Sequence, residues 1–290
     1  MGPSMTMIDR RRPDVGSVVW AQLRLPPFPQ VAIRVMQLAN KENVQLHQLS
    51  ELISSDPAFA SEVLTVANSL LYAPRYPANS IHQAVAVMGI NHLQGMCLTV
   101  GARVYMGNAR ALPVTQAIWR HSMASALIAE QLAKAGFMDK DLAYTSGVLH
   151  DIGRLALSTV RAKEYAELLE THAGPAASIL QAERDRFGMD HCEIGQRLIS
   201  DWKLPRDLGA IVSLHHASRQ ENGTWNMLEL INVSCRMADA VGFPAFQGCE
   251  VAPFAELLDQ LPPRERSQFQ SDLPALTEMI SKKIEAVESL

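Results

Sequence analysis

Apolar residues recur at helical spacing along almost the whole chain, and this periodicity limits the fold more than any other feature. Val31, Val35 and Leu38 follow a Pro-rich segment at residues 25–29 and share one helical face. No strong segment alternates apolar with polar residues, and residues 212–214 are too few to predict a strand. The sequence therefore predicts an all-α protein.

Two helix starts are marked by their capping residues. Asp56 precedes Pro57, which places a capping side chain before a proline at the first helical position. Ser80 and Gln83 have the spacing of a capping box, in which each side chain bonds to the backbone of the other. We therefore expect helices to begin close to residues 57 and 81.

Composition narrows the class of protein. With 290 residues, 48% hydrophobic and 19% charged, the chain can form one large or two modest cores. A net charge of -4 argues against a broad nucleic-acid surface, and the basic run at residues 10–12 is typical of a solvated tail. No apolar run reaches the roughly 18 residues of a membrane helix, and we see no secretory signal.

The cysteines indicate a reducing compartment. Cys97, Cys192, Cys235 and Cys249 are scattered without C-x-x-C spacing. This distribution favours buried reduced thiols over disulfides or a zinc knuckle. Together with the lack of a signal sequence, it predicts a cytoplasmic protein.

We expect the chain to divide into four parts. A break in helical periodicity at residues 107–114 predicts a boundary between two helical lobes. The predicted parts are a disordered or extended tail (1–19), an N-terminal lobe (20–110), a second lobe (111–245) and a helical C-terminal extension (246–290). The prolines of the extension predict short helices packed on the outside.

The second lobe carries a spaced set of metal-ligand residue types. An adjacent imidazole and carboxylate, closed by a carboxylate far along the chain, can assemble a divalent metal site in an all-α protein. Asp151 lies in an apolar helix, where a buried carboxylate costs several kcal/mol unless it is paired or bound to a cation. Gly153 would let the backbones pack closely. The set is His121, His150, Asp151, His191, His215 and Asp239, with His216 as a further candidate.

Each of these residues also has a purely structural interpretation. A lone histidine such as His121 is more often a hydrogen-bonded residue than a ligand. Asp151 can cap a helix or pair with Arg154, and Asp239 can form an ion pair with Arg236.

The remaining histidines have local explanations as well. Asp190 can cap a helix whose first turn contains His191. His215 and His216 end a helix, where a positive charge is favourable. Because adjacent side chains point in different directions, at most one of this pair should face a given metal. The recurrence of all these residues in one lobe nevertheless favours a site.

The ligand types indicate which metals would bind. Mixed imidazole and carboxylate ligands suit iron, manganese, zinc or nickel better than calcium or magnesium. The number of candidates is enough for one or two metals per chain, and two metals could activate a bridging hydroxide.

At these residues the chain resembles the HD superfamily, and more closely its HDOD family of bacterial signalling modules. The resemblance covers roughly residues 20 to 245 and implies an all-α, two-lobed fold with an HD-like second lobe. Members of the family are used in signal transduction, generally without demonstrated enzymatic activity. The matching segments are residues 25–29, 53–57, 66–69, 84–89, 119–122, 147–153, 190–195, 202–205, 215–216 and 238–239.

Several positions distinguish the chain within this resemblance. The residues matching the HD set (His121, His150, Asp151 and Asp239) are all present, whereas many HDOD proteins have lost part of it. His191 and His215 or His216 match the extra histidines of dinuclear relatives such as HD-GYP phosphodiesterases and diiron oxygenases.

Other positions disfavour a cyclic-di-GMP phosphodiesterase. Residues 217–223 lack the Gly-Tyr-Pro signature. Arg154 stands where those hydrolases have a lysine, and Ala117 where trinuclear versions have a glutamate.

Three hypotheses remain open. The leading one is a regulatory HDOD module that binds signalling proteins or a nucleotide, with a metal at the HD site that holds helices together. The second is an active metal-dependent phosphohydrolase or diiron oxidase in which Arg154 contacts the substrate. The third is a scaffold in which these residues form buried salt bridges without metal. Nucleic acid and membrane are not expected partners.

Overall fold

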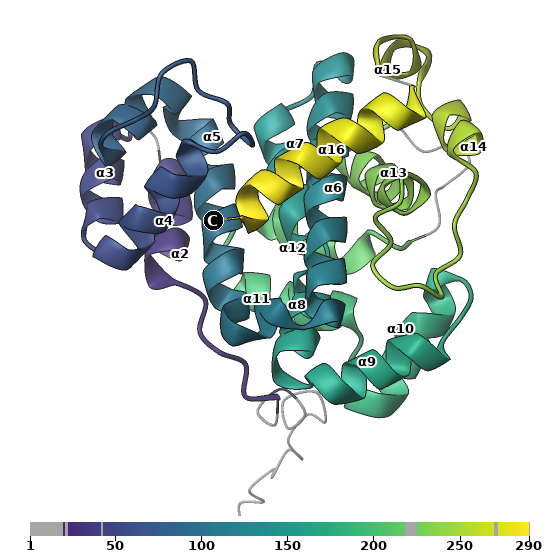
Figure 1. Ribbon diagram of the computed structural model, residues 1–290. Coiled ribbons are helices and arrows are strands. Elements are labelled where there is room, and N and C mark those ends of the chain that lie inside the picture. The colour runs from purple at the N-terminus through teal and green to yellow at the C-terminus, as the bar shows by residue number, and fades with distance from the viewer. Residues whose placement is uncertain (1–19, 21–22, 42, 218–224, 270–271, 290) are drawn as a thin grey trace, which may run out of the picture.

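The computed structural model describes residues 20, 23–41, 43–217, 225–269 and 272–289 (Figure 1). In this part of the chain every regular secondary-structure element is a helix. An isolated β-bridge joins Gly174 to Cys249. The all-α prediction is confirmed. The predicted tail at residues 1–19 lies outside the described residues.

Four helices form the first lobe. The capping signals behave largely as predicted: the Asp56 carboxylate accepts from the backbone N–H groups of Ala58 and Phe59, and Ser80 accepts from Gln83. The Gln83 side chain, however, accepts from the backbone N–H of Asn79, so only half of the predicted capping box forms. The helices are α2 (Gln30–Ala39), α3 (Leu46–Ser54), α4 (Pro57–Ala67) and α5 (Ile81–Met106).

Helix α5 is shared between the two lobes. It packs against α2, α3 and α4, and also against α7 of the second lobe. It bends at Gly89, where φ is 77° and ψ is 170°, a conformation that glycine adopts without a side-chain clash. In the described residues no single helix is long and apolar enough to cross a membrane. One bent pair, Ile81–Ile90 with His92–Ala111, meets that test together by length and composition.

The second lobe surrounds one long helix. Helix α6 packs between α7 and α13, and α11 packs on α8 and α12 (Figure 1). A short 3₁₀ turn (Gly107–Ala111) lies where the lobe boundary is expected. The helices are α6 (Pro113–Gly136), α7 (Lys140–Leu149), α8 (Ile152–Val160), α9 (Ala162–Thr171), α10 (Ala176–Phe187), α11 (His191–Asp201), α12 (Arg206–Leu214) and α13 (Met227–Ala240).

The C-terminal segment differs from the expected series of short helices. Helices α14 (Phe254–Asp259) and α15 (Pro263–Gln268) are short, but α16 (Leu273–Glu288) has 16 residues. Pro274 lies in the first turn of α16, where a proline is tolerated, so it does not interrupt the helix. Figure 1 shows α16 crossing in front of α6, and ion pairing of Arg120 with Glu288 joins the two helices.

Candidate metal centre

The predicted site residues meet inside the second lobe, although separate helices supply them. His121 lies within α6, His150 and Asp151 form the junction of α7 and α8, and His191 is the first residue of α11. His215 directly follows α12. Each of these five side chains is at most 1% exposed, so its polar atoms must find partners inside the protein.

Two glycines let these helices approach one another. A Cβ atom at Gly153 would lie 1.9 Å from the carbonyl oxygen of His191, and one at Gly147 would lie 2.4 Å from the Cα atom of Ala126. Any larger residue would separate α8 from α11 or α7 from α6. The predicted role of Gly153 in close packing is confirmed.

One oxygen of Asp151 faces two imidazoles. Its Oδ2 atom lies 3.8 Å from Nε2 of His121 and 3.7 Å from Nε2 of His150, and the two nitrogens are 3.3 Å apart. In a tetrahedral site with metal bonds of about 2.1 Å, neighbouring ligand atoms are about 3.4 Å apart. The three atoms are therefore spaced like ligands of one metal ion.

The other oxygen of Asp151 faces a second group of imidazoles. Its Oδ1 atom lies 3.4 Å from Nε2 of His191 and 3.4 Å from Nε2 of His215. Nε2 of His216 lies 3.1 Å from Nε2 of His191. The Asp151 carboxylate is thus placed between two groups of nitrogen atoms.

Both of the paired histidines reach this region. The rings of His215 and His216 lie 4.0 Å apart, and both contact the cluster. Helix α12 ends at Leu214, and His215 is its C-cap, with α-helical φ and ψ. The preceding α-helix was predicted correctly.

The outward nitrogens of four imidazoles are held by acceptors. Because an imidazole that donates from Nδ1 and is neutral carries its lone pair on Nε2, the Nε2 atoms are available as metal ligands. Such a partner on the second nitrogen is the usual support of a metal-binding histidine. The Nδ1 atoms donate as follows: His121 to the carbonyl of Phe243 (2.8 Å), His150 to that of Gly147 (2.7 Å), His215 to that of Val212 (2.8 Å), and His191 to the Glu183 carboxylate (2.6 Å).

The contacts of the Nε2 atoms indicate whether a divalent metal fits between them. Facing lone pairs, such as those of His121 and His150, repel unless a proton or a cation lies between them. Nε2 of His215 is buried and makes no hydrogen bond, although Asp151 lies 3.4 Å away. A cation between Asp151 and the imidazoles would satisfy both features, so the residues fit a metal.

A buried ionic network supports Asp151 and His191. Arg154 donates from Nε to Asp151 (3.1 Å) and from Nη1 to Tyr165 (3.2 Å) and Glu183 (3.4 Å). The Tyr165 hydroxyl also donates to Glu183, at 2.7 Å. The pairing of Asp151 with Arg154, predicted as the structural alternative, therefore exists together with the imidazole contacts.

Sequence reasoning missed Tyr165 and Glu183. The available signal was the buried stripe of α10, in which Glu183 falls four residues after Ile179 and four before Phe187. A carboxylate on such a stripe needs a buried partner.

The charge states depend on these pairings. Burial opposes ionisation of Glu183, but His191 and Arg154 overcome it and lower its pKa to about 2. Burial also opposes ionisation of Asp151, yet the Arg154 guanidinium holds its pKa well below the ordinary value. Burial lowers the pKa of His150 to about 3 against the pull of Asp151. His150 is thus neutral near pH 7, the state in which imidazole binds metal.

Helix α13 brings two residues to His121. Oδ1 of Asp239 lies 3.1 Å from Nδ1 of His121, the nitrogen that donates to Phe243. Cys235, one turn earlier, places its Sγ atom 3.4 Å from Nε2 of His121. Arg236, the alternative partner considered for Asp239, donates to Gln260 at 2.9 Å. Cys235 is a buried free thiol, as predicted, but its place in the cluster was not predicted.

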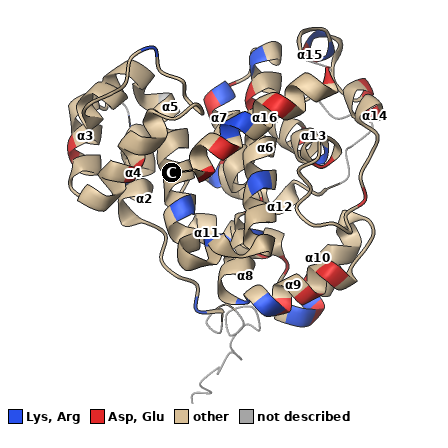
Figure 2. Ribbon diagram, viewed as in Figure 1, with Lys and Arg blue, Asp and Glu red and all other residues tan. Residues whose placement is uncertain are grey.

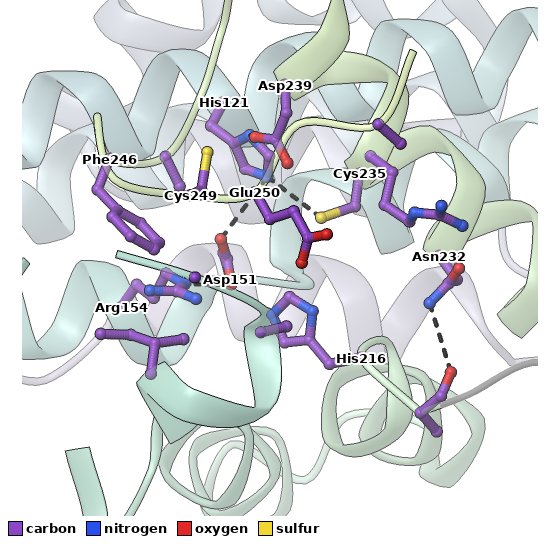
Figure 3. A pocket seen from close by; sticks show the side chains of 17 residues that line it. His121, Asp151, Arg154, His216, Asn232, Cys235, Asp239, Phe246, Cys249 and Glu250 are labelled. Carbon is purple, nitrogen blue, oxygen red and sulfur yellow. Dashed lines mark hydrogen bonds and ion pairs between the residues drawn. The ribbon is translucent and has the colours of Figure 1, made fainter. Parts of the chain in front are cut away.

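A cavity of about 320 Å³ opens onto this cluster (Figure 3). Its volume is in the range of small-molecule sites. Figure 3 shows His121, Asp151 and His216 directed towards it, with the side chains of Arg154 and Phe246 on one side. Two arginines and three acids line it: Arg154, Arg236, Asp151, Asp239 and Glu250. Residues 218–223, in which the Gly-Tyr-Pro signature is missing, lie outside the described part of the chain.

Comparison with known proteins identifies a family for most of the chain. A model of the HDOD domain matches residues 25–218. An uncharacterized protein of Treponema pallidum is 25% identical over 198 residues, which are 66% of this chain and 37% of that protein. The chain thus spans little more than a third of this relative.

Solved structures share the fold. An HDOD domain protein of unknown function from Geobacter sulfurreducens has a TM-score of 0.67 and 22% identity, over 95% of this chain and 97% of that one. A structure from Shewanella amazonensis, described as a candidate phosphohydrolase, has a TM-score of 0.68 and 20% identity, over 94% and 98%. A candidate signal transduction protein from Marinobacter aquaeolei has a TM-score of 0.70 and 21% identity, over 92% and 60%.

Proposed function

Because the chain belongs to the HDOD family and retains a full set of metal-ligand residues, we propose that its second lobe is a metal-dependent phosphohydrolase centre. One observation carries the proposal: four buried imidazoles with Nδ1 held by acceptors present Nε2 to both oxygens of Asp151. This arrangement suits a metal that is bound and exposed to the cavity beside it. The description of the Shewanella amazonensis relative is in keeping with this reaction class.

Each residue has a defined task in this proposal. His121, His150 and Asp151 would hold one metal, and Asp151, His191 and His215 a second, with His216 beside it. A divalent metal at this place would polarise a phosphoryl oxygen and lower the pKa of a bound water. The ligand types favour zinc, iron, manganese or nickel.

The cavity residues act on the substrate. Arg236 and Arg154 provide positive charge for a phosphate group. Since Nε and Nη1 of Arg154 donate to Asp151, Tyr165 and Glu183, Arg154 acts mainly by holding Asp151 in place. Arg236 is the better candidate for direct contact with phosphate. The cavity volume of about 320 Å³ suits a small phosphate ester, including part of a nucleotide.

Metal content and phosphate release test the proposal together. The protein, purified without chelator, should contain bound transition metal and hydrolyse p-nitrophenyl phosphate or bis(p-nitrophenyl) phosphate. Asp151→Asn should lose the metal and lower turnover about 10³-fold, because a metal supplies several kcal/mol of transition-state stabilisation. The matched change Asp259→Asn, at an exposed carboxylate, should alter neither. A folded protein that refuses added metal would exclude the proposal.

A second candidate function is binding of a signalling partner by the first lobe. Three large apolar side chains are exposed in the α4–α5 connection and the start of α5: Leu70 (53%), Tyr76 (69%) and Val87 (64%). Exposed apolar residues of this kind favour a protein contact when they are close enough to form a patch. In this case the metal would stabilise the fold and the first lobe would carry the signal.

Partner capture from a bacterial lysate distinguishes the two candidates. If the first lobe binds the partner, Val87→Glu should abolish capture and Asp151→Asn should leave it intact. Capture that Val87→Glu does not change would exclude this surface.

A further inference from the structure

The metal centre has a feature that the histidine and aspartate pattern does not include. We propose that Cys235, rather than Asp239, is the ligand that α13 contributes to the metal held by His121 and His150, which makes this position a thiolate site that prefers zinc. The inference rests on the proposed metal centre and specifies its ligands.

The position of the Cys235 sulfur matches a ligand. Sγ lies 3.4 Å from Nε2 of His121, and the ligand atoms of His121, His150 and Cys235 all lie within 4.8 Å of one another. In a tetrahedral zinc site, with Zn–S of about 2.3 Å and Zn–N of about 2.1 Å, sulfur and nitrogen are about 3.5 Å apart. Figure 3 shows His121 in contact with both Cys235 and Asp151. The sulfur thus approaches the same nitrogen that faces Asp151.

Asp239 approaches His121 from the other side. Its Oδ1 atom lies 3.1 Å from Nδ1, and Nδ1 already donates to Phe243. Cys235 and Asp239 are four residues apart on α13 and therefore share one helical face. They reach opposite nitrogens of one ring, so only Cys235 lies beside the nitrogen that is available to a metal.

Cys192 lies in the second group of imidazoles, where its sulfur and the ligand atoms of His191, His215 and His216 all lie within 4.8 Å of one another. Its Sγ atom lies 3.9 Å from Nδ1 of His215. That nitrogen donates to the carbonyl of Val212, at 2.8 Å. Cys192 therefore lies at the occupied nitrogen of His215, while Nε2 faces Asp151. Both cysteines are buried and free, so they differ mainly in which nitrogen they approach.

A thiolate would change which metal the centre selects. Soft sulfur ligands favour zinc over magnesium and manganese, whereas a carboxylate in the same place does not. Because the thiol must lose its proton to bind, metal uptake should release one more proton than a site built from neutral imidazoles and carboxylate alone.

Cobalt(II) spectroscopy on the full chain tests the assignment. Stripped protein is titrated with cobalt under reducing, oxygen-free conditions, and the near-ultraviolet thiolate-to-cobalt charge-transfer band is recorded. The wild type, the control Cys97→Ser and Asp239→Asn should show the band, and Cys235→Ser should lose it. A band that survives in Cys235→Ser and is lost in Cys192→Ser would overturn the assignment and identify Cys192 as the sulfur ligand. Competition with zinc should show that Cys235→Ser binds the metal more than about 10-fold more weakly than the wild type. Loss of a residue that only supports a ligand typically weakens metal binding by at least about 10-fold, and loss of a ligand should cost no less.

X-ray absorption of the zinc-loaded wild type gives a second measurement that does not depend on how a variant folds. One sulfur neighbour at about 2.3 Å from zinc is expected. Cobalt binding without the band, or zinc without a sulfur neighbour, would overturn the Cys235 assignment and leave the metal centre intact. Absence of both cobalt and zinc binding in folded wild type would overturn the centre as well.

Discussion

The two lobes have similar helical packing but very different interiors. The buried polar side chains of the first lobe (α2–α5) are Ser50, Ser69, Thr99 and Arg103. The second lobe (α6–α13) encloses histidines, Arg154 and three carboxylates, which are Asp151, Glu183 and Asp190. Figure 2 shows that charged residues are sparse along α2, α3 and α4. The first lobe therefore relies mainly on apolar burial.

The buried charged groups of the second lobe destabilise the fold, and apolar packing of its helices does not remove this cost. Buried ionised groups destabilise a fold unless they are paired or bind a cation. Arg154 with Glu183 provides pairing, and the proposed metal would provide the cation. The difference between the lobes therefore predicts that only the second depends on metal and on buried charge pairs.

Removal of the metal should produce the largest difference between the lobes. A ligand present at 1,000 times its dissociation constant stabilises the folded state by about 4 kcal/mol. Chelation should therefore lower the free energy of unfolding by about this amount and increase hydrogen exchange in α8 and α11 much more than in α2–α4. Hydrogen-exchange mass spectrometry of the metal-loaded and metal-free protein measures the exchange of each helix, and urea unfolding measures the change in free energy. An equal increase in both lobes would contradict the comparison.

Loss of the Glu183 charge should have the next largest effect. Glu183→Gln leaves Arg154 buried with one partner fewer, and breaking a buried pair typically costs about 3–5 kcal/mol. The matched change in the first lobe is Glu62→Gln, because the Glu62 side chain is 37% exposed and lies 3.8 Å from Arg103. That variant should lose less than about 1 kcal/mol. Urea unfolding of both variants gives the two values.

The Glu183 effect should also depend on pH. His191 and Arg154 lower the pKa of Glu183 to about 2, from an ordinary value of 4.5. A group whose pKa is lower in the folded state stabilises it fully above the unfolded pKa and loses that contribution as pH falls through the folded value. The stability difference between wild type and Glu183→Gln should therefore shrink as pH falls from about 4.5 towards 2. A difference that stays constant over this range would exclude ionised Glu183 as its source.

Sequence patterns predicted the local secondary structure well, but they predicted only some of the residues that make up the site. Apolar periodicity and the caps at Asp56 and Ser80 depend on neighbouring residues, and they located α2 and the starts of α4 and α5. The length of α16 was missed because Pro274 was read as an interruption, although it lies in the first turn.

The same limit applies to the site. His121, His150 and Asp151 were identified because they follow a pattern along the chain. Cys235 and Glu183 enter the centre only through contacts with residues far from them in sequence, which no local pattern records. Spacing shows that a residue lies on a buried face, but not which side chain from another helix it meets.

Close packing around the centre should make one glycine more important than another. Gly153→Ala would place Cβ 1.9 Å from the carbonyl oxygen of His191, whereas a Cβ at Gly209 would lie 3.6 Å from Cγ2 of Ile199. We expect Gly153→Ala to cost about 1–3 kcal/mol and to weaken metal binding. Gly209→Ala should be neutral or stabilise α12 by up to about 1 kcal/mol. Thermal unfolding and metal titration of both variants test this; equal effects would show that α8 and α11 can separate freely.

The smallest expected effect is the loss of a helix cap. Each lobe has a helix capped by an aspartate, so the two caps can be compared for their effects on stability and on metal binding. Asp56 accepts from the first turn of α4, and Asp190 accepts from the backbone N–H of Glu193 in α11. Replacing either by alanine should cost about 1 kcal/mol through loss of the cap. Asp190 also pairs with Arg184 and directly precedes His191, so its loss should additionally loosen a metal ligand. Zinc affinity should fall in Asp190→Ala and stay unchanged in Asp56→Ala; equal affinities would mean that Glu183 alone fixes His191.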